Sequence, residues 1–304
     1  MQNMEIIQEL KARGFDRVEI LDGKACGISE QRLILCFISY EADDADASKK
    51  CRDAVIHAYY PVSQQAYRAA REFAERCRED GLQIRLANEI HIKRILNRLP
   101  FLRRGRNTLS FLPEAGSRFH VQILTSEEDL PVTAEMEAEE HQIACGSCRK
   151  CMEACPGHAI TENGFERERC LRFWMMNGKM PPEETAERMG NRLLGCDDCE
   201  ACCPMNRTGG SAEEEQTQGR APATVPLKNL IEGDHHDALA EKIGRNYAIP
   251  NRVLTQACLI AGSLGRTDLT GALEKLQNQS ASPAVREAAE WAVSRLKCEQ
   301  KLNL

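Results

Sequence analysis

Long apolar runs are missing from this sequence. No stretch of eighteen consecutive apolar residues occurs, and Met1–Gly14 carries acids and bases throughout its short apolar part. A membrane-spanning helix and a secretory signal peptide are therefore not expected. We expect a soluble, cytoplasmic protein.

Motifs for phosphate-bearing cofactors and an excess of basic charge are missing as well. The chain has no glycine-rich dinucleotide fingerprint and no P-loop, so nicotinamide and nucleotide-hydrolysis chemistry have no support. Its 40 Lys and Arg residues are outnumbered by 46 Asp and Glu residues, which gives a formal net charge of −6. A chain-wide basic surface for nucleic acid is therefore excluded, whereas a local basic patch is not.

Cysteine, by contrast, is abundant and concentrated. The 304 residues include 15 cysteines, and nine of them lie between Cys145 and Cys203. The overall density is below that of small disulfide-rich proteins. In a reducing compartment such a concentration predicts a metal-binding region rather than a disulfide framework.

The first cysteine motif has the spacing C-x2-C-x2-C-x3-C-P. It comprises Cys145, Cys148, Cys151 and Cys155, followed by Pro156. In bacterial ferredoxins the first three cysteines of this motif bind one [4Fe-4S] cluster and the fourth binds another. Zinc is the competing interpretation, but zinc sites favour two C-x2-C pairs and need no third evenly spaced cysteine before Cys-Pro. We therefore predict iron–sulfur clusters.

The second motif, CDDCEACCP, is shorter than the first. Cys203 carries the proline and is expected to bind the other cluster. Cys196 and Cys199 then need one more local thiolate, which either Cys170 or Cys202 supplies; the simplest assignment uses Cys170. The predicted ligands are Cys145, Cys148, Cys151 and Cys203 for the first cluster, and Cys155, Cys170, Cys196 and Cys199 for the second.

Helical and strand patterns around this region predict an α+β protein. Helices are expected at residues 4–13, in the stretch that follows 41–48 and ends near Ala58, after Pro61, at 251–263, at 272–277 and from Pro283 onward. Strands are expected at 17–21, 33–38, 82–86, 108–112 and 119–125. The expected domains are an α/β sandwich domain over 1–135, a ferredoxin-like double [4Fe-4S] domain over 136–207, a linker with a connecting helix over 208–245, and a HEAT-like helical domain over 246–304.

Three stretches carry a resemblance to a known family. CGSCRKCMEACPGHAI (145–160), ERCLRF (168–173) and MGNRLLGCDDCEACCPMN (189–206) resemble epoxyqueuosine reductase and its relatives. Weaker similarity extends upstream through 105–125 and downstream into the helical repeat. The resemblance implies that a cysteine at the position of Cys170 is a cluster ligand. It also implies an N-terminal corrinoid-binding domain related to reductive dehalogenases, a double [4Fe-4S] domain and a C-terminal HEAT-like domain.

The activity implied by the resemblance belongs to queuosine biosynthesis and tRNA processing. It is the reductive removal of the epoxide oxygen of a modified tRNA nucleoside, with electrons relayed through two [4Fe-4S] clusters to a cobalamin. A ferredoxin or a flavodoxin is the type of electron donor expected, and tRNA is the expected partner. We therefore expect an oxidoreductase.

The chain departs from the family pattern where corrinoid and substrate are expected. The catalytic aspartate of the family has no counterpart in residues 85–93, where Glu89 is the nearest acid and the candidate proton donor. The family's G-W-x-G-K-N segment is replaced by LRRGRN, which keeps Gly105 and Asn107. These departures favour an alternative, an electron-transfer protein that has lost corrinoid and catalytic acid and serves a partner enzyme.

A basic stretch, residues 93–106, lies in the same region and contains six Lys and Arg residues without an acid. Such a stretch suits a phosphate-bearing ligand, either a corrinoid tail or an RNA backbone. The alternative is a solvated helix face and loop. The candidate cofactor-binding residues are Arg103, Arg104, Arg106 and Asn107.

Overall fold

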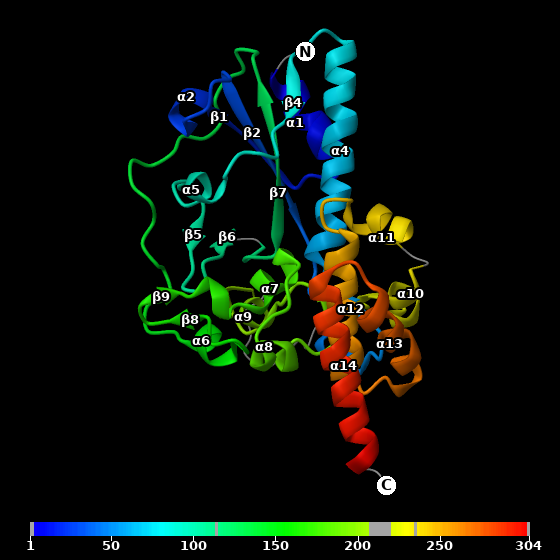
Figure 1. The fold of residues 1–304 in the computed structure, drawn as a ribbon. Coiled ribbons are helices and arrows are strands. Elements are labelled where there is room, and N and C mark those ends of the chain that lie inside the picture. Colours follow the sequence, from blue (N-terminus) through cyan, green and yellow to red (C-terminus); the bar gives the residue numbers. More distant parts are fainter. Residues whose placement is uncertain (1–2, 113–114, 207–219, 234–235, 303–304) are drawn as a thin grey trace. The chain divides into compact units, whose positions relative to one another are not determined.

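The computed structural model describes residues 3–112, 115–206, 220–233 and 236–302 (Figure 1). Residues 208–219 of the linker expected over 208–245 lie outside the described residues. The chain forms two compact units, each built from separate stretches of sequence. The first unit comprises Met1–Tyr40, Pro61–Arg149 and Cys203–Ala212, and the second comprises Glu41–Tyr60, Lys150–Cys202 and Glu213–Leu304.

The first unit contains a four-stranded antiparallel sheet with the strand order β1-β2-β7-β4. The alternation of side chains between the two faces of the sheet is clearest in β2. Leu33, Leu35 and Phe37 belong to one apolar core, and Ile34 and Cys36 belong to another. Because successive side chains of a strand point to opposite faces, this sheet is covered on both sides. The strands are β1 (Arg17–Asp22), β2 (Arg32–Ser39), β7 (Phe119–Ser126) and β4 (Ile84–Leu86), close to the ranges expected from the sequence.

One face of this sheet packs against the long helix α4 (Tyr59–Glu79) and helix α1 (Asn3–Ala12). Both helices were expected from the sequence, although α4 begins two residues before Pro61. The buried side chains of α4 recur every three or four residues, which places them on one helix face; they are Val62, Ala66, Ala70, Phe73 and Cys77. The other face is covered by α5 (Lys93–Leu96) and by loops. Smaller elements of this unit are α2 (Gly23–Cys26), β5 (Arg103–Arg104) and β6 (Ser110–Phe111).

The second unit contains a three-stranded sheet with the order β10-β3-β11. The central strand β3 (Ala54–Ile56) pairs in parallel with β10 (Arg192–Leu194) and antiparallel with β11 (Ala223–Val225). A helix running toward Ala58 was expected here, and that expectation is wrong. Helix α3 covers only Ala45–Lys50, because the following apolar residues form buried strand pairs with segments distant in sequence.

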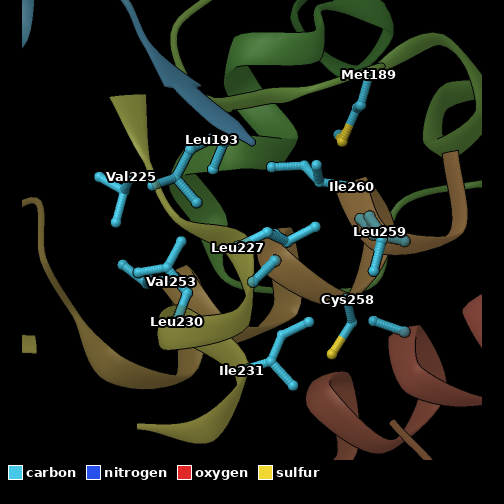
Figure 2. Close-up of a cluster of buried hydrophobic side chains, with 14 of the residues drawn as sticks. Met189, Leu193, Val225, Leu227, Leu230, Ile231, Val253, Cys258, Leu259 and Ile260 are labelled. Carbon is cyan, nitrogen blue, oxygen red and sulfur yellow. The ribbon is translucent and has the colours of Figure 1, made fainter. Parts of the chain in front are cut away.

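Helices α10 (Leu227–Glu232), α11 (His236–Ile243), α12 (Pro250–Ser263), α13 (Thr270–Gln279) and α14 (Pro283–Leu302) complete the second unit. Their apolar side chains form one core with β10 and β11, of which Figure 2 shows Leu193, Leu227 and Leu259. The last three helices confirm the ranges expected from the sequence. Helix α14 packs on α12 so closely that a Cβ at Gly262 would lie 2.7 Å from the Trp291 ring. None of the described helices is long and apolar enough to cross a membrane.

Candidate iron–sulfur centre

The 15 cysteines are all described, and none of them is paired in a disulfide. The predicted ligands lie in turns and very short helices, which suits a region where metal bonds replace much of the packing. Within the second unit these elements are α6 (Lys150–Ala154), β8 (Ile160–Thr161), β9 (Gly164–Phe165), the 3-10 turn Arg167–Arg169, α7 (Leu171–Asn177), α8 (Glu183–Arg188) and α9 (Asp198–Ala201).

A small core rich in sulfur lies at the centre of this region. Cys151 and Cys155 are buried in it together with Ala159 and Ile160. Partly buried side chains packed against them are Met152, Cys170, Cys199 and Cys202. The turns and short helices therefore bring cysteines from three separate stretches of sequence into one group.

A close main-chain contact places Cys155 beside Cys170. A Cβ at Gly157 would lie only 1.9 Å from the carbonyl oxygen of Arg169, so only glycine allows these two segments to approach each other. Gly157 follows Cys155-Pro156, and Arg169 directly precedes Cys170. The loop after the first motif is thereby fixed against the isolated cysteine.

A second glycine controls the approach to Cys196. Gly195 has a φ of +89°, and a Cβ there would lie 2.6 Å from the Cβ of His57 and 2.9 Å from the Tyr60 ring. Both the left-handed backbone and the crowding require glycine at this position. The residue just before Cys196 therefore packs directly against the segment that leads into α4.

The surroundings of Cys196 and Cys199 disfavour the charged thiolate form of both side chains. Burial raises the pKa of both thiols. The negative charge of Asp198 raises the pKa of Cys196 further. For Cys199, the further contributions to the raised pKa come from Cys196, Cys155, Glu200 and Cys170. Three predicted ligands of the second cluster thus lie close enough to Cys199 to influence its ionisation. Thiols in such surroundings ionise when a metal replaces the proton.

Hydrogen bonds surround these sulfur atoms. The Ala159 N–H donates to Cys155 Sγ at 3.3 Å, and the Cys196 thiol lies 3.4 Å from Asp198 Oδ2. Arg192 Nη2 donates to both carboxylate oxygens of Asp198, at 3.0 and 2.9 Å. The Cys202 thiol is directed at the Cys199 carbonyl oxygen, 3.7 Å away. This carboxylate, its cationic partner and the main chain organise the second motif.

In the first unit, the candidate residue Arg106 contacts the beginning of the first motif. Its main-chain N–H donates to Cys145 Sγ at 3.3 Å, and its Nη2 donates to the Gly146 carbonyl oxygen at 3.1 Å. The Cys148 N–H in turn donates to the Cys145 carbonyl oxygen at 3.1 Å. The loop that carries Arg106 is therefore attached to the cysteine segment.

The other candidates of the basic stretch have different contacts. Arg103 Nη1 donates to the carbonyl oxygens of Pro100 and Leu102, at 2.7 and 2.8 Å. Asn107 is 5% exposed, and its Oδ1 accepts a hydrogen bond from the Leu109 N–H at 3.2 Å. These interactions build the local loop. Arg104 lies 3.6 Å from a carboxylate oxygen of Glu140.

Glu89, the candidate proton donor, lies at the surface of the first unit. Its side chain is 67% exposed and lies 3.5 Å from Arg85 Nη1. An exposed ion pair of this kind contributes little to stability and does not isolate a proton from water.

Two buried polar pairs near the cysteine motifs were not predicted from the sequence. In the first unit, buried Asn206 accepts a hydrogen bond at Oδ1 from the Ser117 N–H at 2.6 Å. This bond anchors the segment that follows Cys203. In the second unit, buried Glu200 lies 3.8 Å from His57 Nε2. Neither pair has a sequence signal, because the partners are 89 and 143 residues apart in the chain.

Comparisons with known proteins agree with this chemistry. Residues 144–206 match the family model described as a 4Fe-4S double cluster binding domain. Epoxyqueuosine reductase of Bacillus subtilis is 24% identical over 255 residues, which are 81% of this chain and 64% of that protein. That of Alicycliphilus denitrificans is 32% identical over 207 residues, which are 63% and 55% of the two proteins. The chain thus spans less than two thirds of the length of these relatives.

Solved structures show the same fold. A crystal structure of epoxyqueuosine reductase with an epoxyqueuosine-modified tRNA stem loop matches with a TM-score of 0.70 at 18% identity, covering 96% of this chain and 89% of that one. The grouped thiols, the two cysteine motifs and the matching domain all fit two [4Fe-4S] clusters. Residues 144–206 thus carry the double cluster domain, and the chain is similar in sequence and in fold to epoxyqueuosine reductases.

Proposed function

We propose that this protein is an iron–sulfur oxidoreductase of the epoxyqueuosine reductase type, which acts reductively on a modified nucleoside of tRNA. The observation that carries the proposal is the double cluster motif, with Cys155 fixed beside Cys170 by the Gly157 contact. Bound [4Fe-4S] clusters supply one-electron transfer at low potential. The chain's own residues hold the thiolates, limit the access of water to them and set the charge around them.

For the second cluster we propose Cys155, Cys170, Cys196 and Cys199 as ligands. Cys155, Cys170 and Cys196 all contribute to the raised pKa of Cys199, which supports their convergence. Cys202 packs against the same core and is the alternative to Cys170. For the first cluster we propose Cys145, Cys148, Cys151 and Cys203, and this set rests on the sequence spacing.

The substrate is proposed on the basis of relatives, and the corrinoid on the family resemblance of the cysteine motifs. The curated relatives are named epoxyqueuosine reductase, and one similar structure contains an epoxyqueuosine-modified tRNA stem loop. Arginines of the basic stretch supply cationic groups suited to an RNA backbone. A corrinoid would supply the nucleophilic metal centre that opens an epoxide.

The second candidate function is electron transfer to a partner enzyme, without a corrinoid. It is favoured by the exposed position of Glu89 and by the involvement of Arg103 and Asn107 in building their own loop. Glu89 and Arg103 stand where the family pattern is lost, whereas Asn107 is a residue that the chain keeps.

Anaerobic titration of the reconstituted protein with cob(II)alamin distinguishes the two functions. For a reductase we expect tight binding with a change to the base-off EPR spectrum, followed by conversion of epoxyqueuosine in tRNA when dithionite or a reduced flavodoxin is supplied. Protein that holds about eight irons but binds no cobalamin and converts no epoxyqueuosine would rule out the reductase and leave the electron carrier. Colourless protein that binds zinc instead would overturn both.

A further inference from the structure

The loop that carries Arg106 is tightly built. The Gly105 N–H donates to the Leu109 carbonyl oxygen at 2.8 Å, and the Thr108 N–H donates to the Gly105 carbonyl oxygen at 3.0 Å. A Cβ at Gly105 would lie 2.5 Å from the Phe111 ring. Thr108 adopts a φ of +67°, which is unusual for a residue other than glycine. The position of the Arg106 main chain is therefore fixed by its surroundings.

This loop is joined to the first cysteine motif by main-chain contacts on both sides of Cys145. The Ala144 N–H donates to the Arg104 carbonyl oxygen at 2.9 Å, and the Arg106 N–H donates to Cys145 Sγ at 3.3 Å. The Arg106 guanidinium then reaches the Gly146 carbonyl oxygen at 3.1 Å. All of these residues belong to the first unit. A permanent positive charge is thus held next to the loop of the first motif.

Hydrogen bonds and positive charge near a cluster thiolate change its redox properties. Reduction adds negative charge, so an N–H donor and a nearby cation stabilise the reduced form and raise the reduction potential. Around the second motif the balance of charge is different. Cys155 Sγ also accepts an N–H bond, from Ala159, but the acids Asp198 and Glu200 flank Cys199. Arg192 is engaged there by the Asp198 carboxylate.

We propose that Arg106 is a positioning residue of the first [4Fe-4S] site, which orients Cys145 and raises the reduction potential of the cluster bound there. The proposal rests on the cluster ligands of the proposed function. It gives Arg106 a role that differs from binding a phosphate, because its guanidinium is directed at the cysteine loop. Arg103 belongs to the same basic stretch, but its guanidinium is directed at the carbonyl groups of Pro100 and Leu102.

The test compares Arg106→Met with Arg103→Met in full-length, anaerobically reconstituted protein. Each variant removes one positive charge, and Arg106→Met keeps the main-chain N–H. Iron content is measured first, and the reduction potentials of both clusters are then measured by EPR-monitored titration with dithionite. We expect Arg106→Met to shift one of the two potentials to more negative values and Arg103→Met to shift neither. Arg106→Lys, which keeps the charge, should restore most of the wild-type potential.

The other outcomes are decisive as well. Unchanged potentials in Arg106→Met, or equal shifts in the Arg103 and Arg106 variants, would overturn the proposal. If Arg106→Met loses about four irons while Arg106→Lys and Arg103→Met retain all of them, the positioning role is supported directly. Wild-type protein without iron–sulfur clusters would instead contradict the proposed function itself.

Discussion

Gly157 and the carbonyl group of Arg169 are in direct main-chain contact, with room for a hydrogen atom but not for a methyl group. A Cβ at Gly157 would lie 1.9 Å from the Arg169 oxygen. This contact links the loop after Cys155 to the turn before Cys170. A single glycine therefore determines whether two of the proposed ligands of the second cluster can meet.

Replacing Gly157 by alanine should separate these two ligands. Relief of the clash requires a main-chain movement that costs about 1–3 kcal/mol and displaces Cys155 relative to Cys170. We expect Gly157→Ala to bind about four irons per chain instead of about eight, as measured by iron and sulfide analysis after anaerobic reconstitution.

Gly271 provides the matched control, because a Cβ at this position would have no described neighbouring atom within 4 Å. It lies in helix α13, where alanine is favoured over glycine by about 1 kcal/mol. Gly271→Ala should retain all the iron and unfold at the same or a higher temperature. Full iron content in Gly157→Ala would show that the contact does not govern the second site.

The choice between Cys170 and Cys202 is tested by removing each thiol in turn. We expect Cys170→Ala to lose one cluster, about four irons, because three thiolates leave one iron without a protein ligand. Cys202→Ala should keep both clusters and the wild-type EPR spectrum. The reverse pattern would make Cys202 the ligand and Cys170 the spare thiol.

The sequence predicted the double cluster domain because its strongest signals are local. The spacing from Cys145 to Cys155 and the apolar periodicity of residues 62–77 each lie within one short segment. The strand at Ala54–Ile56 was missed because its partners β10 and β11 lie more than 130 residues away. The contacts of Asn206 with Ser117 and of Arg106 with Cys145 were not predicted for the same reason: each joins residues that only the folded chain brings close.

Asn206 should be required for the first cluster through its bond to Ser117. The Asn206→Ala variant leaves the buried Ser117 N–H without this acceptor, which costs about 1–3 kcal/mol. Since Cys203 lies three residues earlier, we expect weaker retention of one cluster and a lower unfolding temperature. Both are measured by iron release to a chelator and by thermal denaturation.

Two further variants control this experiment. Asn206→Asp keeps an oxygen acceptor for the Ser117 N–H and should retain more iron than Asn206→Ala. Asn278→Ala removes an exposed asparagine on α13 and should behave as wild type. Equal iron release from wild type and Asn206→Ala would assign the bond no role in holding Cys203.

His120, on β7, should make the protein sensitive to mild acid. Burial lowers the pKa of His120 from 6.5 to about 4. The unfolded chain therefore binds a proton more readily than the folded chain between these values. The neutral histidine contributes its full share of the free energy of unfolding above pH 6.5. That share, at most about 3 kcal/mol, is lost as the pH falls toward 4.

Between pH 7 and pH 5, we expect the unfolding temperature of His120→Gln to fall by less than that of wild type. His91 is exposed, and replacing it by glutamine should leave the pH dependence of the unfolding temperature as in wild type. Parallel profiles for His120→Gln and wild type would show that another group carries the acid sensitivity.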